Sequence, residues 1–173
     1  MRFKPLNNEV WIAEAPLTHV SGADIATLKE HAAKNPRHRM RICAHRAPAD
    51  RLHEMLIVLT SQTYIRPHQH PHKSESLHVI EGRADAVFFD DAGPVTEVIE
   101  LGDYGSGRPF YYRIEAPQFH TLRIQSDFLV FHETTNGPFN RADTTFAPWA
   151  PEENDLAGQQ RFMKELRTTV GKV

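Results

Sequence analysis

Short apolar runs separated by turn residues occupy the middle of the chain, from Arg39 to about Glu133. The clearest runs are Met55–Thr60, Leu77–Ile80, Ala86–Phe89 and Phe128–Phe131. The segment from Asp90 to Pro94 contains the residues of a tight turn between two of them. Many short strands with no helical pattern between them predict an antiparallel β-sandwich or barrel.

A helix is predicted on each side of this region. Residues 21–34 form an amphipathic pattern that begins with a capping box of Ser21 and Asp24 and cannot continue past Pro36. A second helix is expected from Glu152 to Arg167, with acidic residues early and basic residues late, as the helix dipole favours. Its apolar face would comprise Leu156, Phe162, Met163 and Leu166.

Trp149 lies between two prolines, just before the second expected helix. We expect it to anchor that helix on the barrel, and a place in the wall of a pocket is the alternative. The whole chain is expected to form a single domain of residues 1–173. Its parts would be an N-terminal extension with a helix (1–38), a barrel (39–140) and a C-terminal extension with a helix (141–173).

Length and composition are those of an ordinary soluble domain. The chain has 173 residues, of which 40% are hydrophobic and 24% charged, enough to bury a core. Apolar runs such as Phe128–Phe131 are too short to span a bilayer, and no secretory signal is visible, so no membrane association is expected. The single cysteine, Cys43, excludes an internal disulfide and fits a reducing compartment. We therefore expect a cytoplasmic protein.

The net charge of −2 gives no global field that would favour nucleic acid. The one basic cluster is Arg37, Arg39 and Arg41, which would share a face of an extended segment and could hold phosphate or carboxylate groups. A solvated charged strand is the alternative. No nucleic-acid partner is expected, because aromatic interleaving and a wider basic surface are both missing from the sequence.

The candidate chemistry lies in the segment from His68 to Gly82 and at one later histidine. His68 and His70 are two residues apart, so both side chains leave the same face of a strand. A hairpin between His70 and Glu75 would bring that carboxylate back beside them. With His120, these side chains form a typical ligand set for one divalent transition metal ion, and Fe, Mn, Ni and Zn all suit it.

Other histidines fit the ligand set less well. His72 shares the alternation of His68 and His70, but it lies in the expected turn after Pro71. His78 and His132 should face away from the metal, because each is an odd number of residues from a position expected to face it. Cys43 and His45 also alternate, yet nothing nearby completes a ligand set. We interpret Cys43 as a buried small hydrophobe.

The ligand spacing resembles that of a known superfamily. His68-x-His70-x4-Glu75-x6-Gly82 is similar to the first signature motif of the cupins, with Gln62 in place of its leading glycine. Pro117-x-x-His120 resembles a degenerate second motif, which lacks its internal glycine and has Ile124 where asparagine is usual. The resemblance implies an antiparallel jelly-roll barrel with one bound metal ion.

A narrower resemblance is to the cupin-fold metalloproteins of the WbuC type, which are found with O-antigen polysaccharide genes. It implies a sugar or sugar-nucleotide as the small-molecule ligand, and cupin barrels commonly form homodimers, which we expect here. The matching segments span roughly residues 35–153 and are 35–39, 64–70, 73–76, 80–82, 137–139 and 146–152.

Four further residues are candidates for handling the ligand. Tyr64 and Arg66 share the alternation of His68 and His70, so they should face the same interior, Tyr64 as a catalytic residue and Arg66 as a substrate-binding one. Arg41 is the second substrate-binding candidate. Glu133 corresponds to a glutamate of the WbuC type and could act as a general base or contact a metal ligand, although an exposed strand-end glutamate is the alternative.

Three functions remain open at this point. The first is a metal-dependent enzyme, an isomerase, epimerase or oxygenase acting on a small polar molecule. The second is a protein that binds or senses such a molecule without turnover. The third is a structural metal site, which we rank last because structural zinc sites are usually closed and rich in cysteine.

Overall fold

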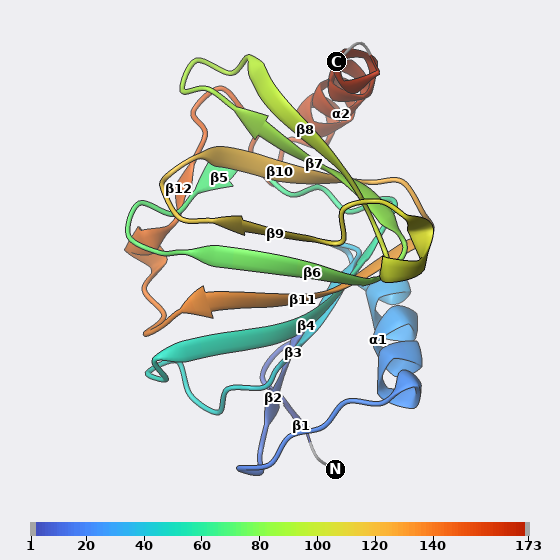
Figure 1. Ribbon diagram of the computed structural model, residues 1–173, viewed down its shortest axis with the longest axis vertical. Coiled ribbons are helices and arrows are strands. Elements are labelled where there is room, and N and C mark those ends of the chain that lie inside the picture. The colour runs from blue at the N-terminus through green and yellow to red at the C-terminus, as the bar shows by residue number, and fades with distance from the viewer. Residues whose placement is uncertain (1–2, 172–173) are drawn as a thin grey trace.

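The structure is a computed structural model that describes residues 3–171, and it consists of two β-sheets with a helix on the outer face of each (Figure 1). The larger sheet has seven strands in the order β1-β2-β3-β4-β11-β6-β9, and the smaller sheet has five in the order β12-β5-β10-β7-β8. All neighbouring strands pair antiparallel except β2 and β3. This is the jelly-roll arrangement expected from the sequence.

The strands of the larger sheet are β1 Phe3–Pro5, β2 Val10–Ala13, β3 Arg39–Cys43, β4 Leu52–Thr60, β6 Glu75–Glu81, β9 Tyr111–Ile114 and β11 Phe128–Asn136. The strands of the smaller sheet are β5 His68–Gln69, β7 Arg83–Phe89, β8 Val95–Gly102, β10 Phe119–Ile124 and β12 Thr145–Phe146. The helices are α1 Gly22–Lys34 and α2 Leu156–Val170, with short 3-10 turns at Tyr104–Ser106 and Arg141–Asp143.

The main core lies between the two sheets. Leu77 and Val79 of β6 meet Ala86 and Phe88 of β7 in one buried cluster, and alternate residues of the other strands complete it. Because side chains alternate along a strand, the residues between these positions face outward. Burial of this apolar face fixes which side chains of each strand can reach the interior.

Helix α1 covers the outer face of the larger sheet. Its N-terminus has the expected capping box, in which the Ser21 side chain accepts from the Asp24 backbone and the Asp24 carboxylate accepts from Ser21 N–H at 2.7 Å. Leu28 and Ala32 are fully buried against Val58 and other residues of β3, β4 and β11. The helix ends at Lys34, as predicted from Pro36.

Helix α2 packs on the outer face of the smaller sheet, at the upper end of the view in Figure 1, whereas α1 lies lower along the right side. It begins at Leu156, four residues later than expected, because the Asp155 side chain caps the backbone of Gly158. Leu156 is 68% exposed and does not belong to the apolar face, which corrects that part of the prediction. Trp149 contacts Phe162 of the helix and Phe89 of β7, so its expected anchoring role is confirmed.

Gly82 makes the sharp connection between β6 of one sheet and β7 of the other. Its φ is +91°, and a Cβ there would lie 2.2 Å from the Phe128 carbonyl oxygen and 2.6 Å from Ser126 Oγ. Only glycine fits this conformation and this close approach. The glycine that ends the first cupin-like motif is therefore explained by the change of sheet.

Within residues 3–171, no helix is long and apolar enough to cross a membrane. The three-part division of the chain at residues 38 and 140 stays a prediction.

Candidate metal centre

Three histidines and one glutamate converge at one end of the barrel. His68 of β5 is the direct cross-strand partner of His120 of β10, and Glu75 begins β6 of the other sheet. His70 lies in the connection from β5 to β6. One ligand atom from each residue lies within 4.8 Å of all the others, and this is the only such group among residues 3–171. The four side chains could hold one metal ion.

The expected hairpin between His70 and Glu75 is wrong. Strand β5 is only two residues long and belongs to the smaller sheet, whereas β6 belongs to the larger sheet. The chain crosses from one sheet to the other between them, so Glu75 meets the histidines across the barrel interior and not along a ladder. The distances are 3.2 Å from Glu75 Oε2 to His70 Nε2 and 3.6 Å from Glu75 Oε1 to His120 Nε2.

All three imidazoles are oriented by backbone carbonyls. Nδ1 lies 2.9 Å from the Arg66 oxygen in His68, 3.0 Å from the Asp143 oxygen in His70 and 2.9 Å from the Gln118 oxygen in His120. A carbonyl can only accept, so each Nδ1 carries a proton and Nε2 is the nitrogen that each ring can offer to a metal ion. The three Nε2 atoms are the ligand atoms of the group, and their orientation by backbone carbonyls is typical of metal-binding histidines.

The orientation of His70 depends on a segment far along the chain. Thr144 Oγ1 lies 3.3 Å from its Nδ1, beside the Asp143 carbonyl. The Asp143 carboxylate forms an ion pair with Lys73 Nζ at 3.2 Å, and Lys73 also donates to the Pro138 oxygen at 3.1 Å. Lys73 therefore holds the segment after β11 against the residues that precede Glu75.

The ionisation states of His68 and Glu75 suit metal binding. Burial, and then the nearby His120, lowers the pKa of His68 to about 3, so this imidazole is neutral at pH 7. Burial alone would raise the pKa of Glu75, but its contacts with His120 and His70 hold that pKa well below its usual range. Neutral imidazole and ionised carboxylate are the forms that ligate metals. Burial would lower the pKa of His70, but its hydrogen bond with Glu75 raises that pKa above the usual value, so a metal ion would compete with a proton there.

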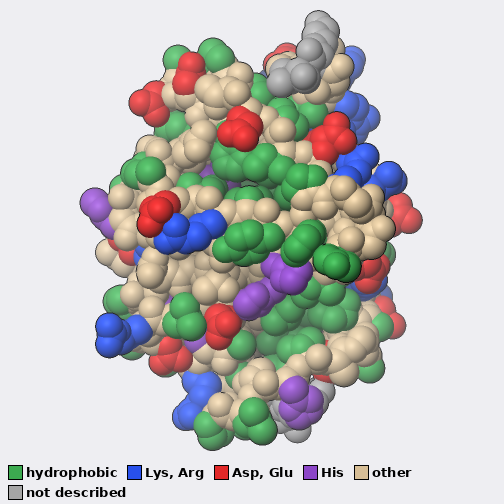
Figure 2. All heavy atoms as spheres, in the orientation of Figure 1, with side chains coloured by type: hydrophobic (Ala, Val, Ile, Leu, Met, Phe, Trp, Pro, Cys, Tyr) green, Lys and Arg blue, Asp and Glu red, His purple; other side chains and the backbone are tan. Residues whose placement is uncertain are grey.

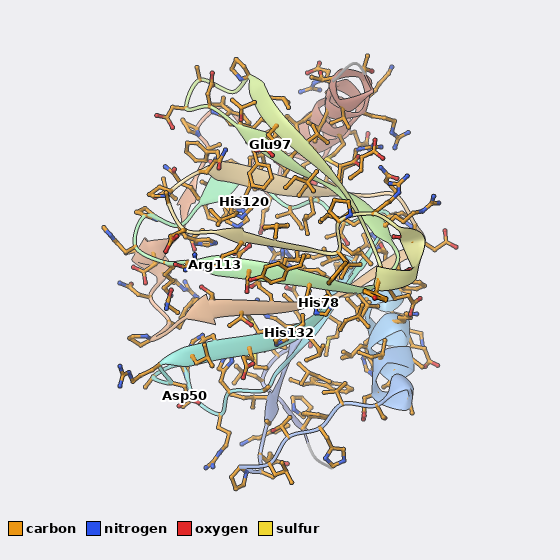
Figure 3. All side chains as sticks on the ribbon, viewed as in Figure 1. Asp50, His78, Glu97, Arg113, His120 and His132 are labelled. Carbon is orange, nitrogen blue, oxygen red and sulfur yellow. The ribbon has the colours of Figure 1, made fainter. Side chains whose placement is uncertain are left out.

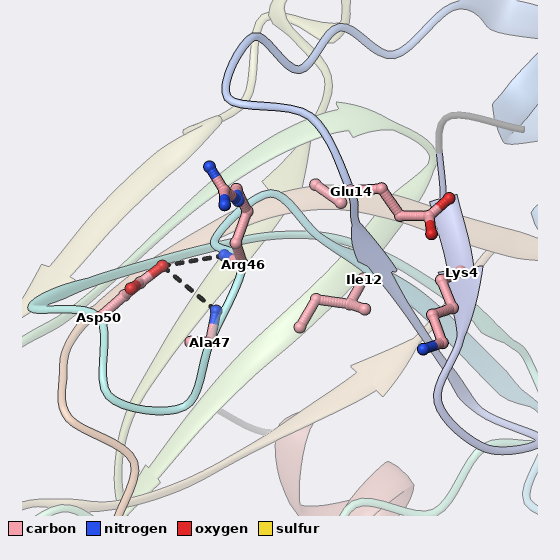
Figure 4. Close-up of a pocket in the computed structure, with 7 residues that line it drawn as sticks. Lys4, Ile12, Glu14, Arg46, Ala47 and Asp50 are labelled. Carbon is pink, nitrogen blue, oxygen red and sulfur yellow. Dashed lines mark hydrogen bonds between the residues drawn. The ribbon is translucent and has the colours of Figure 1, made fainter.

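Away from the histidines, a hollow of about 620 Å³ lies between the loop that follows β3 and strands β1 and β2 (Figure 4). Charges of both signs line it, from Lys4, Glu14, Arg46 and Asp50. The Asp50 carboxylate accepts from the backbone of Arg46 and Ala47, so it organises the loop. No group of metal-ligand type gathers there among the described residues, and we place the functional site at the histidines.

Comparison with known proteins supports the fold but assigns no specific function. A model for a family described as a domain of unknown function (DUF6016) matches residues 20–101, which is less than half of the chain. No curated protein sequence matches. The structure is similar to that of protein SO0799 from Shewanella oneidensis, with a TM-score of 0.55 and 13% identity over 77% of this chain and 87% of that one.

Looser similarity is found to two proteins of stated function. The capsular polysaccharide assembling protein CapF from Staphylococcus aureus has a TM-score of 0.48 and 20% identity over 62% of this chain, which spans 31% of CapF. The DMSP lyase DddQ from Ruegeria pomeroyi has a TM-score of 0.49 and 17% identity over 66% of this chain and 54% of that one. At these values neither similarity bears on function.

The deciding observation is the combination of a two-sheet jelly roll with a His-His-Glu-His group inside it, at the spacing of the cupin motifs. The chain has the cupin fold. The narrower WbuC type stays a prediction.

Two of the residues expected to face the cupin interior do not lie on a strand with the ligands. Strand β5 begins only at His68, so the assumed alternation back to Tyr64 and Arg66 is wrong. The Tyr64 hydroxyl donates to the Pro151 oxygen at 2.8 Å, and its ring contacts Phe162 of α2. Burial raises the pKa of Tyr64 to about 12. Tyr64 therefore joins the helix to the barrel, outside the ligand group.

The Arg66 guanidinium lies nearer the ligand group than Tyr64 does, one aromatic ring away from it. The guanidinium is 5.2 Å from the centre of the Phe146 ring, which is 6.2 Å from the His68 ring. Its Nη2 donates to the Ala147 oxygen at 3.3 Å. Arg66 thus borders the site, but its hydrogen bond and its ring contact hold the segment around β12.

The arginine row is mostly engaged with carboxylates. Arg39 Nε lies 2.9 Å from Glu9 Oε2, and Arg37 pairs with both Glu9 and Glu153. Arg41 differs from them, because it points along the inner side of the larger sheet, 3.9 Å from Met55 Sδ. Of the three guanidinium groups, only that of Arg41 is free of carboxylate ion pairs in the described structure.

Glu133 faces the cupin interior, as Met55 and Leu77 do, which are its cross-strand partners. Burial, and then the charge of Glu75, raises the pKa of Glu133 to about 8, although Arg41 and His70 oppose the shift. The structure thus brings Glu133 close to the ligand group. The outward orientation of His78 and His132, which pair with each other across β6 and β11, agrees with the sequence prediction (Figure 3).

Two aromatic residues of the site had no sequence signal. Tyr112 of β9 is the cross-strand partner of Leu77, and burial followed by the charges of Glu75 and Glu133 raises its pKa well above the usual value. Phe88 of β7 contacts both the Tyr112 ring, at 5.9 Å, and the His120 ring, at 6.3 Å. The sequence could place Tyr112 and Phe88 inside the barrel only after the short strands had been assigned, from the alternation of side chains along them.

Proposed function

We propose that His68, His70, Glu75 and His120 bind one divalent transition metal ion and that the protein uses it to act on a small polar molecule. The observation that carries the proposal is the orientation of three imidazoles by backbone carbonyls, with each Nε2 directed to the point where Glu75 also lies. Four protein ligands leave positions open for a ligand or water on Fe, Mn or Ni, whereas Zn would have to expand beyond its usual four ligands. The donor set does not distinguish these metals.

The bound metal would supply Lewis acidity, or redox chemistry if it is iron or manganese. The protein's own contribution is acid–base chemistry beside it. Without a metal ion, the pKa of Glu133 of about 8 keeps this carboxyl protonated at neutral pH, and the charge of a bound metal ion would lower that pKa and favour transfer of the proton to a bound molecule. We propose Glu133 as the group that moves a proton. The Tyr64 hydroxyl donates to the Pro151 oxygen and would not serve in this role.

The resemblance to WbuC-type proteins supports a sugar or sugar-nucleotide as the small molecule, in the biosynthesis of surface polysaccharide such as O-antigen. The alternative is that the metal holds such a molecule without turnover. The two alternatives differ in one measurable way. Only the enzyme would convert a candidate sugar to a product in the presence of metal, and Glu133→Gln would abolish that conversion while leaving binding in place.

Metal stoichiometry tests the first step. The protein, expressed and loaded with Co(II) or Zn(II), should contain one tightly bound ion per chain by elemental analysis. His70→Ala should lose it, whereas His78→Ala, which alters a histidine on the outer face of the same barrel, should keep it. A wild-type protein without tightly bound metal, or equal metal content in the two variants, would contradict the proposal.

Two further expectations from the sequence remain proposals. We propose a homodimer, to be tested by light scattering over a wide range of concentrations, where a single monomeric species would contradict it. We also propose a cytoplasmic location, which the free, buried thiol of Cys43 fits. Fractionation of cells that express the tagged chain would test this.

A further inference from the structure

A cavity of about 390 Å³ opens between strands β8 and β9. These are the edge strands of the two sheets, and no backbone ladder joins them among the described residues. Phe88 and Tyr112 lie at the cavity floor, beside Ile99 and Ile114. We call this cavity the β8/β9 slot. Figure 2 shows this face of the molecule hollowed between hydrophobic side chains.

The slot leads to the ligand group. The Phe88 ring is 6.3 Å from the ring of His120, and Gln118 at the slot wall supplies the carbonyl that orients His120. In Figure 3, His120 lies between Glu97 on one side and Arg113 on the other. A molecule in the slot would thus be separated from the Nε2 cluster by one aromatic ring.

The charge around the slot is negative. Glu97 is the cross-strand partner of Phe88, so its carboxylate leaves the inner side of β8, toward the slot. No ion pair to Glu97 exists within the described residues. Arg113, the only basic residue in the slot lining, is already paired with Glu115, at 3.0 Å and 3.2 Å. An unpaired carboxylate therefore faces an aromatic and aliphatic floor.

From this arrangement we infer that the β8/β9 slot binds a small organic cation, an ammonium group on an apolar body. Aromatic faces attract such cations and aliphatic walls accommodate the body, while Glu97 supplies the counter-charge. The diphosphate of a nucleotide would be repelled by the carboxylates. Binding in the slot does not depend on the proposed function. Only the further step, in which the bound molecule is presented to the metal, rests on it.

The test uses two probes of almost equal shape. Choline and 3,3-dimethylbutan-1-ol differ in that a quaternary nitrogen of the first is a neutral carbon in the second. Each is titrated by calorimetry into the metal-free protein at low ionic strength, where surface charge interactions are least screened. Isoleucine methyl NMR locates the binding, because Ile99 and Ile114 line the slot.

Choline should bind roughly fivefold more tightly than the alcohol, the size expected for one exposed charge interaction with an aromatic contribution. It should shift the Ile99 and Ile114 methyl signals. Glu97→Gln, which removes the charge and keeps the size, should reduce the preference to the smaller aromatic contribution. Glu100→Gln is the matched control, because Glu100 lies on the outer face of the same strand and pairs with Arg108.

Equal affinity for the two probes, no saturable binding of choline, unchanged preference in Glu97→Gln, or shifts at other isoleucines would each overturn the inference. Repeating the titration with metal-loaded protein separates the two proposals. Choline binding in the slot of a protein that fails to hold metal would refute the proposed function and leave this inference in place. A tight metal site in a protein that does not bind choline would refute this inference and leave the proposed function in place.

Discussion

Replacing Lys73 with methionine should weaken metal binding although Lys73 is no ligand. The side chain is only 10% exposed, and its ion pair to Asp143 and its hydrogen bond to the Pro138 oxygen hold the segment after β11 in place. That segment presents the carbonyl of Asp143 to His70 Nδ1. Methionine has similar length and removes both interactions, so His70 would lose the support that orients it.

The size of the effect follows from the two interactions that the substitution removes. Hydrogen bonds to charged groups contribute about 1.5–3 kcal/mol when they are partly buried, and only part of this reaches His70 through the backbone. Loss of a partner that orients a metal ligand typically costs about 10–100-fold in metal affinity. We expect about a tenfold weaker affinity, equivalent to about 1.4 kcal/mol.

Competition with a chromophoric chelator for Zn(II) measures this affinity. Lys29→Met is the control, because Lys29 likewise pairs with a carboxylate, that of Glu81, and lies over a phenylalanine ring, but it does so from helix α1. The control should keep wild-type affinity. If Lys73→Met binds zinc as tightly as Lys29→Met does, the coupling from Lys73 to His70 is refuted.

Three other outcomes are expected. Arg66→Ala should lower the free energy of unfolding, measured by urea denaturation, by about 1–2 kcal/mol, because the hydrogen bond from its guanidinium to the Ala147 oxygen is lost. Its metal content should not change. A loss of metal would show that the Arg66 side chain supports the ligands directly. In the metal-free protein the pKa of Glu133 is raised to about 8, so the stability that its protonated form contributes should be lost as pH rises from about 4.5 to 8. Thermal melts of Glu133→Gln should lack that loss of stability. Parallel pH profiles of the variant and the wild type would contradict the assignment. Cys43 is 6% exposed and burial raises its pKa, so a thiol reagent should label it only on unfolding, and rapid labelling of folded protein would contradict this.

Spacing within the sequence was enough to predict the ligand group. His68, His70 and Glu75 are close in sequence, and His120 follows a recognisable Pro-x-x-His, so short-range patterns name all four. An antiparallel β-sandwich or barrel was equally predictable from the short apolar runs, and its jelly-roll form from the resemblance of the ligand motif to that of cupins. What failed was the assumption that one strand continues back to Tyr64, because a strand of only two residues leaves no alternation to extend.

The features of the site that the sequence did not predict depend on contacts between distant segments. Nothing in the residues around Lys73 indicates that Asp143, far along the chain, will pair with it. Glu97 has no feature that separates it from any other exposed glutamate until Phe88 is known to be its cross-strand partner. Such pairs depend on the register between strands and on the path of the segment after β11. Local sequence patterns carry neither.

The two sheets contribute different ligands, with His68 and His120 on one and Glu75 on the other. A bound ion would therefore act as a cross-link between layers that are otherwise held together by apolar contact. Saturation to about 100 times the dissociation constant would add about 2.7 kcal/mol to the folded state. The barrel would then resist separation of its layers more strongly as metal supply rises, in proportion to its logarithm, and the chain's lifetime in a cell would depend on how much metal that cell has.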